Sequence, residues 1–249
     1  MNKNKVKEFL RHEKYNANWS RAGHKYLISL FLKLIGLKEL SHQVNFKRKS
    51  KFDLVWLFSY LLELRFSRHS LFRAGKKQKD RIAHTRTVRN ILSDGRINWQ
   101  KLLCLIAARL IASLRPVIDK RRRLVLIVDD TMMPRSSAKK SELLAWVYDH
   151  NKGKTLAGYH GPTLGWSDGN TFLPVSFALM STKSNDNLIG KIKTWDQCSL
   201  AGKRRSQARR QMNNVTVELI KVFPPNMSYL IPDFHRPPIF SAHYKYIRG

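Results

Sequence analysis

A chain of 249 residues is long enough for one large domain or two small ones, and a hydrophobic fraction of 43% excludes a disordered protein. Lys and Arg number 47 against 17 Asp and Glu, which leaves a net charge of +30. Self-repulsion on this scale opposes a compact state unless a polyanion offsets it. The polyanion is then a nucleic acid, an anionic membrane surface or an acidic protein.

The sequence argues against a membrane protein and against a disulfide framework. The most apolar stretches, residues 26–37 and 102–114, are each interrupted by a cation and are too short to span a bilayer. Residues 1–11 are charged without an apolar core, so we expect no signal peptide. Cys104 and Cys198 are the only cysteines, and they lie far apart. We therefore expect a cytoplasmic protein that binds nucleic acid and no membrane.

Residues 1–118 are predicted to form a helical N-terminal region. Apolar residues recur at helical spacing in residues 55–66 and again in residues 102–114. Between them, the basic residues 73–89 lead toward a Ser-Asp-Gly turn at residues 93–95. Two interpretations stay open for this segment: a helix-turn-helix that docks on DNA, and a solvated helical hairpin that packs on the next domain.

A predicted strand follows the cationic run at residues 120–123. Residues 124–128 are consecutive aliphatic residues, too few for a helix and rich in β-branched side chains, which predicts a strand buried on both faces. The strand is expected to end at Asp129 and Asp130.

Two further strands and a basic helical segment are predicted after these aspartates. Residues 156–164 and 171–180 are the strand candidates, and the Asp-Gly pair at residues 168–169 predicts an antiparallel hairpin between them. Residues 187–223 are predicted to be helical, and their first half is strongly basic. The expected fold class is α+β.

A carboxylate at the end of a buried strand points to chemistry. Burying an ionised Asp is costly unless a cation compensates it or the strand leaves the protein interior. Adjacent side chains of a strand point to opposite faces, so we expect at most one of Asp129 and Asp130 to ligate an ion directly. Mg²⁺ prefers carboxylate oxygens, and two such ions about 4 Å apart clamp the oxygens of phosphoryl transfer. A helix N-cap or a simple turn is the alternative interpretation.

At this point the sequence resembles bacterial insertion-sequence transposases of the DDE superfamily, over about residues 50–223. The resemblance is carried by residues 127–131 (Ile-Val-Asp-Asp-Thr), 139–142 (Lys-Lys-Ser-Glu), 147–150 (Val-Tyr-Asp-His), 158–161 (Gly-Tyr-His-Gly), 165–169 (Gly-Trp-Ser-Asp-Gly) and 172–177 (Phe-Leu-Pro-Val-Ser-Phe). The order of these six segments along the chain is what makes the resemblance specific.

The resemblance implies an RNase H-like catalytic domain that cuts transposon ends and joins them to target DNA with Mg²⁺. Asp129 falls on the Asp-x-Thr pattern of the first catalytic aspartate and metal ligand, with Asp130 as the close alternative. Double-stranded DNA is the expected partner, and the intact transposition complex would be a homo-oligomer in the bacterial cytoplasm, associated with the nucleoid. The candidate DNA-binding residues are Lys139, Lys140, Arg204, Arg205, Arg209 and Arg210.

Residues 224–249 depart from the family pattern. The family typically continues with a strand of the form Ala-Lys-Tyr-Val-Leu-x-Asp-Ser-Trp-Phe, which carries the second Asp, whereas residues 224–233 read Pro-Pro-Asn-Met-Ser-Tyr-Leu-Ile-Pro-Asp. With suitable synonymous codons, the neighbouring reading frame permits Lys-Tyr-Val-Leu-Phe-Asp-Ser at this place. The catalytic triad that the resemblance implies is Asp, Asp and a later Glu. We therefore expect a frameshifted tail, in which Asp233 is not the second catalytic Asp and this triad is incomplete.

The expected organisation is a helical region at residues 1–118, a partial RNase H-like domain at residues 119–223 and an aberrant tail at residues 224–249. The leading hypothesis is a transposase that is inactive alone. The alternatives are a non-catalytic basic nucleic-acid-binding protein and a structural protein of a ribonucleoprotein assembly.

Overall fold

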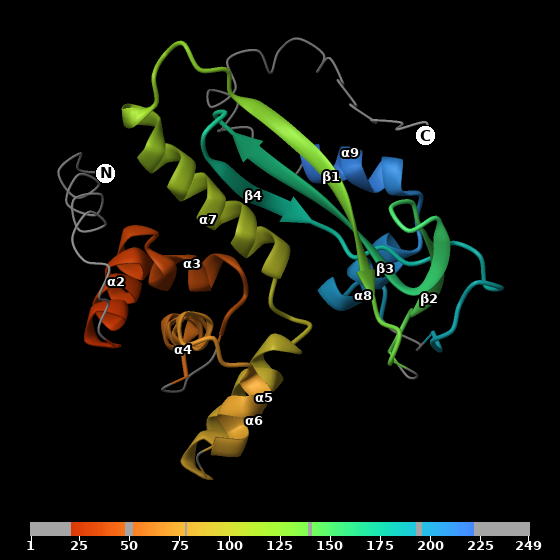
Figure 1. Cartoon of the computed structure of the whole chain (residues 1–249), viewed down its shortest axis with the longest axis horizontal. Helices are drawn as coiled ribbons and strands as arrows, with labels where there is room; N and C mark the ends of the chain where they lie inside the picture. The colour runs from red at the N-terminus through yellow and green to blue at the C-terminus, as the bar shows by residue number, and fades with distance from the viewer. Residues whose placement is uncertain (1–20, 48–51, 78, 139–140, 193–195, 222–249) are drawn as a thin grey trace.

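The computed structural model describes residues 21–47, 52–77, 79–138, 141–192 and 196–221, and it confirms the α+β class. A group of helices lies at one end of the molecule and an antiparallel sheet with further helices at the other (Figure 1). The helical end consists of α2 (Arg21–Leu34), α3 (Leu37–Gln43), α4 (Leu54–Phe66), α5 (Leu71–Lys77) and α6 (Lys79–Leu92).

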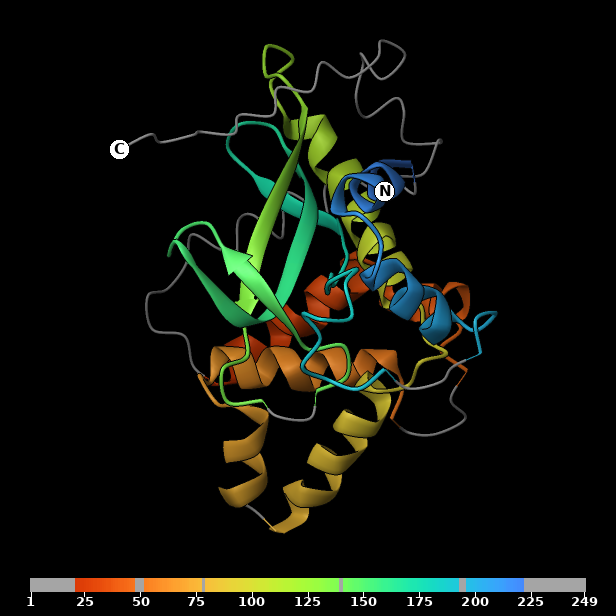
Figure 2. The ribbon, with the colours of Figure 1, turned by 90° about the vertical axis from the view of Figure 1, so that its right-hand side faces the viewer.

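Helix α4 corresponds to the first predicted apolar face. Asp53 caps its N-terminus, because the Asp53 carboxylate accepts a hydrogen bond from the backbone N–H of Trp56 at 2.7 Å. Leu54 and Leu57 of this helix are buried in a core shared with α2, α3 and α7. Helices α5 and α6 form a hairpin that projects from the molecule (Figure 2).

Helix α7 (Trp99–Leu114) joins the two ends of the molecule. Leu102 packs into the helical core, whereas Ala107 and Ile111 pack against the sheet. The Asn98 side chain caps the helix by accepting from the N–H of Lys101 at 3.1 Å. A 3₁₀ turn, η1 (Arg115–Val117), follows directly. The second predicted helical face therefore serves two cores at once.

Four antiparallel strands build the sheet: β1 (Val125–Pro134), β2 (Ala145–Asp149), β3 (Lys154–Ser167) and β4 (Phe172–Phe177). The long β3 lies in the middle, with β1 along one edge and both β2 and β4 along the other. Gly158 shows this arrangement, because it is opposite Pro134 of β1 and Ala145 of β2. In the described part of the chain, β1 pairs only with β3.

The predicted hairpin between β3 and β4 is present. Asp168 holds its turn, since one carboxylate oxygen accepts from the N–H groups of Asn170 at 3.0 Å and Thr171 at 2.6 Å. Gly169 has a φ of 90°, which a residue with a side chain adopts only with strain. The predicted turn at residues 168–169 is therefore confirmed, and both the Asp and the Gly have the roles that such a turn requires.

The strand carrying the aspartates differs from the sequence prediction in two ways. It extends to Pro134, so Asp129 and Asp130 lie in its middle and not at its end. It is also not buried on both faces, because Val125, Ile127 and Val128 are 40 to 45% exposed. The exposure arises because β1 is an edge strand and helices pack over only part of one of its faces. A run of aliphatic residues indicates a strand, but it does not indicate which other elements pack on that strand.

Helices α8 (Leu200–Ala208) and α9 (Met212–Lys221) replace the single helical segment predicted from residue 187. Residues 187–192 and 196–199 are not helical. Val215 and Leu219 of α9 pack with α7 against Leu164 and Trp166 of β3, which forms the core beneath the sheet. Trp166 is fully buried, whereas the Phe172 ring lies over Gly165 and is 52% exposed. Among the described helices, none is long and apolar enough to span a membrane.

Candidate active site

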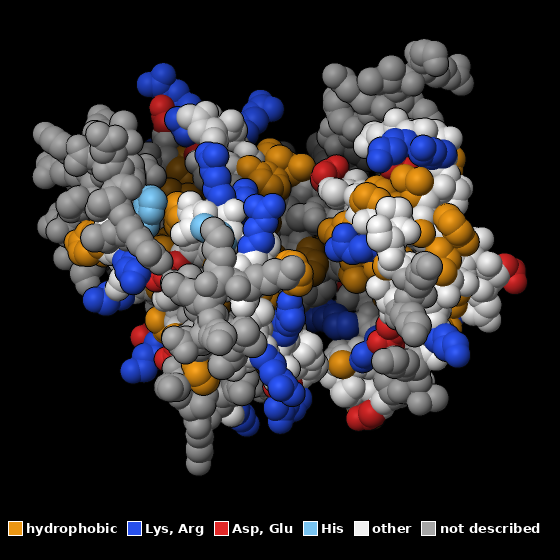
Figure 3. Space-filling model, turned by 60° about the horizontal axis from the view of Figure 1, so that its bottom comes forward, with side chains coloured by type: hydrophobic (Ala, Val, Ile, Leu, Met, Phe, Trp, Pro, Cys, Tyr) orange, Lys and Arg blue, Asp and Glu red, His pale blue; other side chains and the backbone are white. Residues whose placement is uncertain are grey.

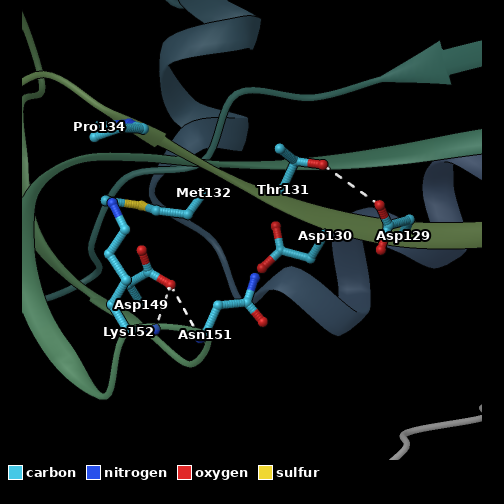
Figure 4. Close-up of a pocket in the computed structure, with 8 residues that line it drawn as sticks. All are labelled: Asp129, Asp130, Thr131, Met132, Pro134, Asp149, Asn151 and Lys152. Carbon is cyan, nitrogen blue, oxygen red and sulfur yellow. Dashed lines mark hydrogen bonds between the residues drawn. The ribbon is translucent and has the colours of Figure 1, made fainter.

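Two adjacent aspartates on β1 form the centre of the candidate site. Asp129 is opposite Thr163 of β3, and Asp130 is opposite Pro162. Because successive side chains of a strand point to opposite faces, the two carboxylates cannot converge on one point without distorting the strand. Figure 4 shows them leaving β1 in different directions. The strand therefore presents one carboxylate to each face.

Asp130 faces His160 of β3. His160 Nδ1 lies 2.7 Å from Asp130 Oδ2; the His160 side chain is 16% exposed and the Asp130 side chain 31%. The hydrogen bond with Asp130 raises the pKa of His160, although burial opposes the shift, and the negative charges of Asp130 and Asp149 act in the same direction as the hydrogen bond. The Asp130 carboxylate thus lies against an imidazole on the neighbouring strand, and this contact favours the protonated form of His160.

Asp129 has a more open environment. Its side chain is exposed, and Oδ2 accepts a hydrogen bond of 3.4 Å from the Thr131 hydroxyl. Asp129 and Thr131 lie two residues apart, so both side chains are on the same face of β1. The Asp-x-Thr spacing seen in the sequence therefore has a structural counterpart, in which the threonine orients the aspartate. Asp129 is the freer of the two carboxylates.

A shallow cleft of about 360 Å³ lies beside these aspartates, between β1 and the β2–β3 hairpin. Its walls combine residues of the two segments (Figure 4). The lining residues are Asp129, Asp130, Thr131, Met132, Pro134, Asp149, Asn151 and Lys152.

Asp149 does not offer the cleft a free carboxylate. It is buried, and its Oδ1 accepts from the N–H of Asn151 at 3.0 Å and of Lys152 at 3.3 Å, which closes the turn between β2 and β3. Asp149 therefore binds the backbone of its own turn, as Asp side chains commonly do.

The described residues do not fit a complete metal site. No group of three or more His, Cys, Asp or Glu side chains that could hold an ion occurs among them. Asp129 and Asp130 diverge, Asp130 is paired with His160, and Asp149 is used by backbone. A two-metal clamp needs several carboxylates around a shared point, and this part of the chain supplies at most one that is free.

The four arginines predicted to contact DNA all have protein partners. Arg205 binds Glu142 through two bonds, of 2.6 and 3.0 Å. Arg209 donates to the carbonyl oxygens of Thr182 and Lys183. These contacts fasten the C-terminal half of α8 to the loops on either side of it.

The other two arginines connect three helices. Arg204 donates to Gln207 of α8 and to the Asn98 cap of α7. Arg210 forms an ion pair with Glu218 of α9. Burial lowers the pKa of Arg204, partly offset by the Glu218 charge. Their role in DNA binding stays a prediction, and Lys139 and Lys140 lie outside the described residues.

Comparison with known proteins places this geometry in a family. The family model of the DDE superfamily endonucleases matches residues 62–223, more than half of the chain. The chain belongs to the DDE superfamily endonucleases. The match includes β1 with both aspartates, the β2–β3 hairpin beside the cleft and the basic helices α8 and α9. No curated protein and no solved structure matched.

Two parts of this site were missed by sequence reasoning. Strand β2 was not predicted, although residues 145–149 alternate between buried Ala145, Val147 and Asp149 and exposed Trp146 and Tyr148. That alternation is visible in the sequence as Ala-Trp-Val-Tyr-Asp. The pairing of Asp130 with His160 has no such signal, because it depends on the register between β1 and β3.

Proposed function

We propose that this DDE superfamily endonuclease acts in DNA transposition, cutting transposon ends and joining them to target DNA. The observation that carries the proposal is the pair Asp129 and Asp130 on β1, beside a cleft, in a chain with a net charge of +30. Phosphoryl transfer on DNA needs a carboxylate centre next to a surface that tolerates a polyanion. The aspartates beside the cleft supply the first requirement, and the positive charge of the chain supports the second.

Double-stranded DNA is the partner we propose. The view toward the α5–α6 end shows Lys and Arg side chains in a band across the surface (Figure 3). Among the side chains between residues 54 and 114 that the structure describes, the exposed basic ones are Arg65, Arg68, Arg73, Arg86, Arg89, Arg96 and Lys101. Such a surface holds phosphates without reading sequence. It supports a DNA-binding role for the helical region at residues 1–118, in either of the two forms left open by the sequence.

We propose Mg²⁺ as the metal of the intact enzyme and Asp129 as the ligand from this part of the chain. Members of the DDE superfamily generally use divalent metals, and such an ion would supply electrostatic stabilisation at the reacting phosphate. Asp129 is exposed and oriented by Thr131, whereas Asp130 is held by His160. The remaining ligands have to come from groups outside the described residues.

The scarcity of free carboxylates supports a second element of the proposal. We infer that the 249-residue chain binds DNA without cutting it, and that an intact transposase, which carries the missing ligands, acts as a homo-oligomer. This favours the non-catalytic binding role for the chain by itself. It would act in the bacterial cytoplasm near the nucleoid, where it would compete with intact copies for transposon ends.

Duplex binding at graded salt concentrations tests the proposal. Each phosphate neutralised on duplex DNA contributes about 0.9 to the slope of log affinity against log salt. We expect a steep slope and little dependence on sequence. Weak binding, or binding indifferent to salt, would remove the basis for a DNA substrate, while supercoiled plasmid with added Mg²⁺ or Mn²⁺ reports any cutting.

A further inference from the structure

Strand β2 carries a row of exposed rings that the site chemistry does not use. Trp146 is 50% exposed and Tyr148 is 47% exposed, and His150 follows at the same two-residue interval. The Tyr148 and His150 rings meet edge to face, with centroids 5.0 Å apart. Large aromatic surfaces are rarely left in water in such a row, so this ring row (Trp146, Tyr148 and His150) needs an explanation.

The neighbouring strand leaves the ring row uncovered. Trp146 is opposite Ala157, and Tyr148 is opposite Thr155. Both partners on β3 have small side chains, so neither can shield an aromatic face. The buried residues of β2 point to the other side, toward the cleft and the core. The ring row is therefore a flat apolar strip on an otherwise cationic protein.

Cations border the strip at its hairpin end. Lys152 and Lys154 are exposed on the turn and on the first residue of β3, and Lys152 also lines the cleft that contains Asp129 and Asp130. The β2–β3 hairpin thus carries the ring row on one side and a wall of the candidate active site on the other. A ligand lying along the strip would reach the cleft around the hairpin.

We propose that the ring row binds unpaired bases of a DNA strand by stacking, with Lys152 and Lys154 contacting its phosphates. Side chains two residues apart on a strand are about 6.6 Å apart. This is about twice the 3.4 Å rise between bases of one strand, so one base fits between the Trp146 and Tyr148 side chains. Every base has a π face, which makes such binding tolerant of sequence. Paired bases inside a duplex cannot enter the strip.

The inference rests on the proposed function and makes it more specific, because it implies that the DNA bound next to the cleft has locally unpaired bases. A purely apolar protein partner would leave the bordering lysines without a role. The positive charge of the chain and of the hairpin turn favours the polyanion.

The test compares a labelled single strand of about 12 nucleotides with a duplex of the same length by fluorescence anisotropy. We expect Trp146→Ala and Tyr148→Ala each to weaken single-strand binding by roughly tenfold, while duplex binding changes less than about twofold. Trp146→Phe should retain most of the affinity. Phe172→Ala is the matched control, since Phe172 is equally exposed but lies on β4 outside the strip.

The outcomes separate the two proposals. Loss of single-strand binding alone supports the strip, and photocrosslinking from bromodeoxyuridine to residues 145–150 should agree with it. Equal losses on both DNAs, or none on either, would overturn the inference while leaving duplex binding as evidence for the proposed function. If the unaltered chain binds neither the single strand nor the duplex, the proposed function itself is contradicted, and the inference falls with it. Capture of a protein by the strip in place of DNA would also overturn the inference.

Discussion

Arg122, in the segment before β1, binds Asp168 in the β3–β4 turn, with 3.0 Å between Nη1 and Oδ2. The Asp168 side chain is 3% exposed, so the pair fixes the entry of β1 against the β3–β4 turn at the same end of the sheet, where Val125 is opposite Ser167. Burial works to raise the Asp168 pKa, but the N–H groups of Thr171 and Asn170 and the Arg122 guanidinium together lower it. The ionised form is the one that the fold stabilises.

The first prediction concerns the pH dependence of this contact. A carboxyl whose pKa is lowered by folding stabilises the protein above its unfolded value of about 3.9, and that stability is lost as the pH falls through the folded pKa. Asp168→Asn keeps an oxygen for the turn but loses the charge. At neutral pH it should lower the free energy of unfolding by about 1 kcal/mol. Urea unfolding should show the difference shrinking only below about pH 4.

Asp168→Ala provides the control for the first prediction. It also removes the acceptor of the Asn170 and Thr171 N–H groups, so the loss should exceed that of Asp168→Asn at every pH. Equal losses for the two variants would mean that the turn bonds contribute nothing measurable. A difference for Asp168→Asn that is unchanged at acid pH would contradict the role of the charge.

The second prediction separates DNA contact from structural support on α8. Arg205 is held by Glu142, whereas Lys203 is exposed two residues earlier on the same helix. Arg205→Gln should lower the melting temperature, since it leaves the half-buried Glu142 carboxylate without its partner. Lys203→Gln should leave melting unchanged and reduce the salt slope of duplex binding by about 0.9 if Lys203 contacts one phosphate.

Charge reversal at all four arginines of α8 and its C-terminal end is a harsher version of this experiment. If these arginines contact phosphates, the reversal should flatten the salt slope of duplex binding. Because each arginine holds a carbonyl, an amide or a carboxylate, the reversed protein should also lose stability. Melting therefore has to be measured beside binding. A stable variant with an unchanged slope would show that this run does not touch DNA.

The third prediction concerns the pair of Asp130 and His160. His160→Gln and Asp130→Asn should each destabilise the protein, and the double variant should cost less than the sum, with a coupling on the order of 1 kcal/mol. Denaturant unfolding of the four proteins in metal-free buffer gives the coupling directly. Additive losses would show that the two groups do not interact in solution, despite their geometry.

The sequence predicted the positions of helices and turns better than the burial and the long-range partners of their side chains. Apolar periodicity located α4 and α7, and the Asp168-Gly169 pair located the β3–β4 turn, because these features depend on neighbours in sequence. It could not predict that Val125 and Val128 are exposed, since burial depends on which elements cover a strand. The ion pair of Arg205 could not be predicted for the same reason. Its partner Glu142 is 63 residues away in sequence, so the basic residues of this helix were predicted to be a DNA-contacting surface.

The last prediction addresses catalysis. Purified 249-residue protein should show no nicking of supercoiled plasmid with Mg²⁺ or Mn²⁺, because the described residues contain no group of three ligands around Asp129. Asp129→Asn should therefore change nothing in that assay. Restoring the neighbouring reading frame after about residue 223 should give metal-dependent cutting, if the frame supplies the expected second Asp and a later Glu. In that repaired protein Asp129→Asn should abolish cutting.

The matched variant Asp130→Asn should reduce cutting by the repaired protein less, because Asp130 contacts His160 and diverges from Asp129. The reverse ranking would assign the ligand role to Asp130. Robust cutting by the 249-residue chain itself would contradict the proposal that its ligand set is incomplete. The carboxylates to test next would then be Asp233, which lies outside the described residues, and Glu218, which is paired with Arg210.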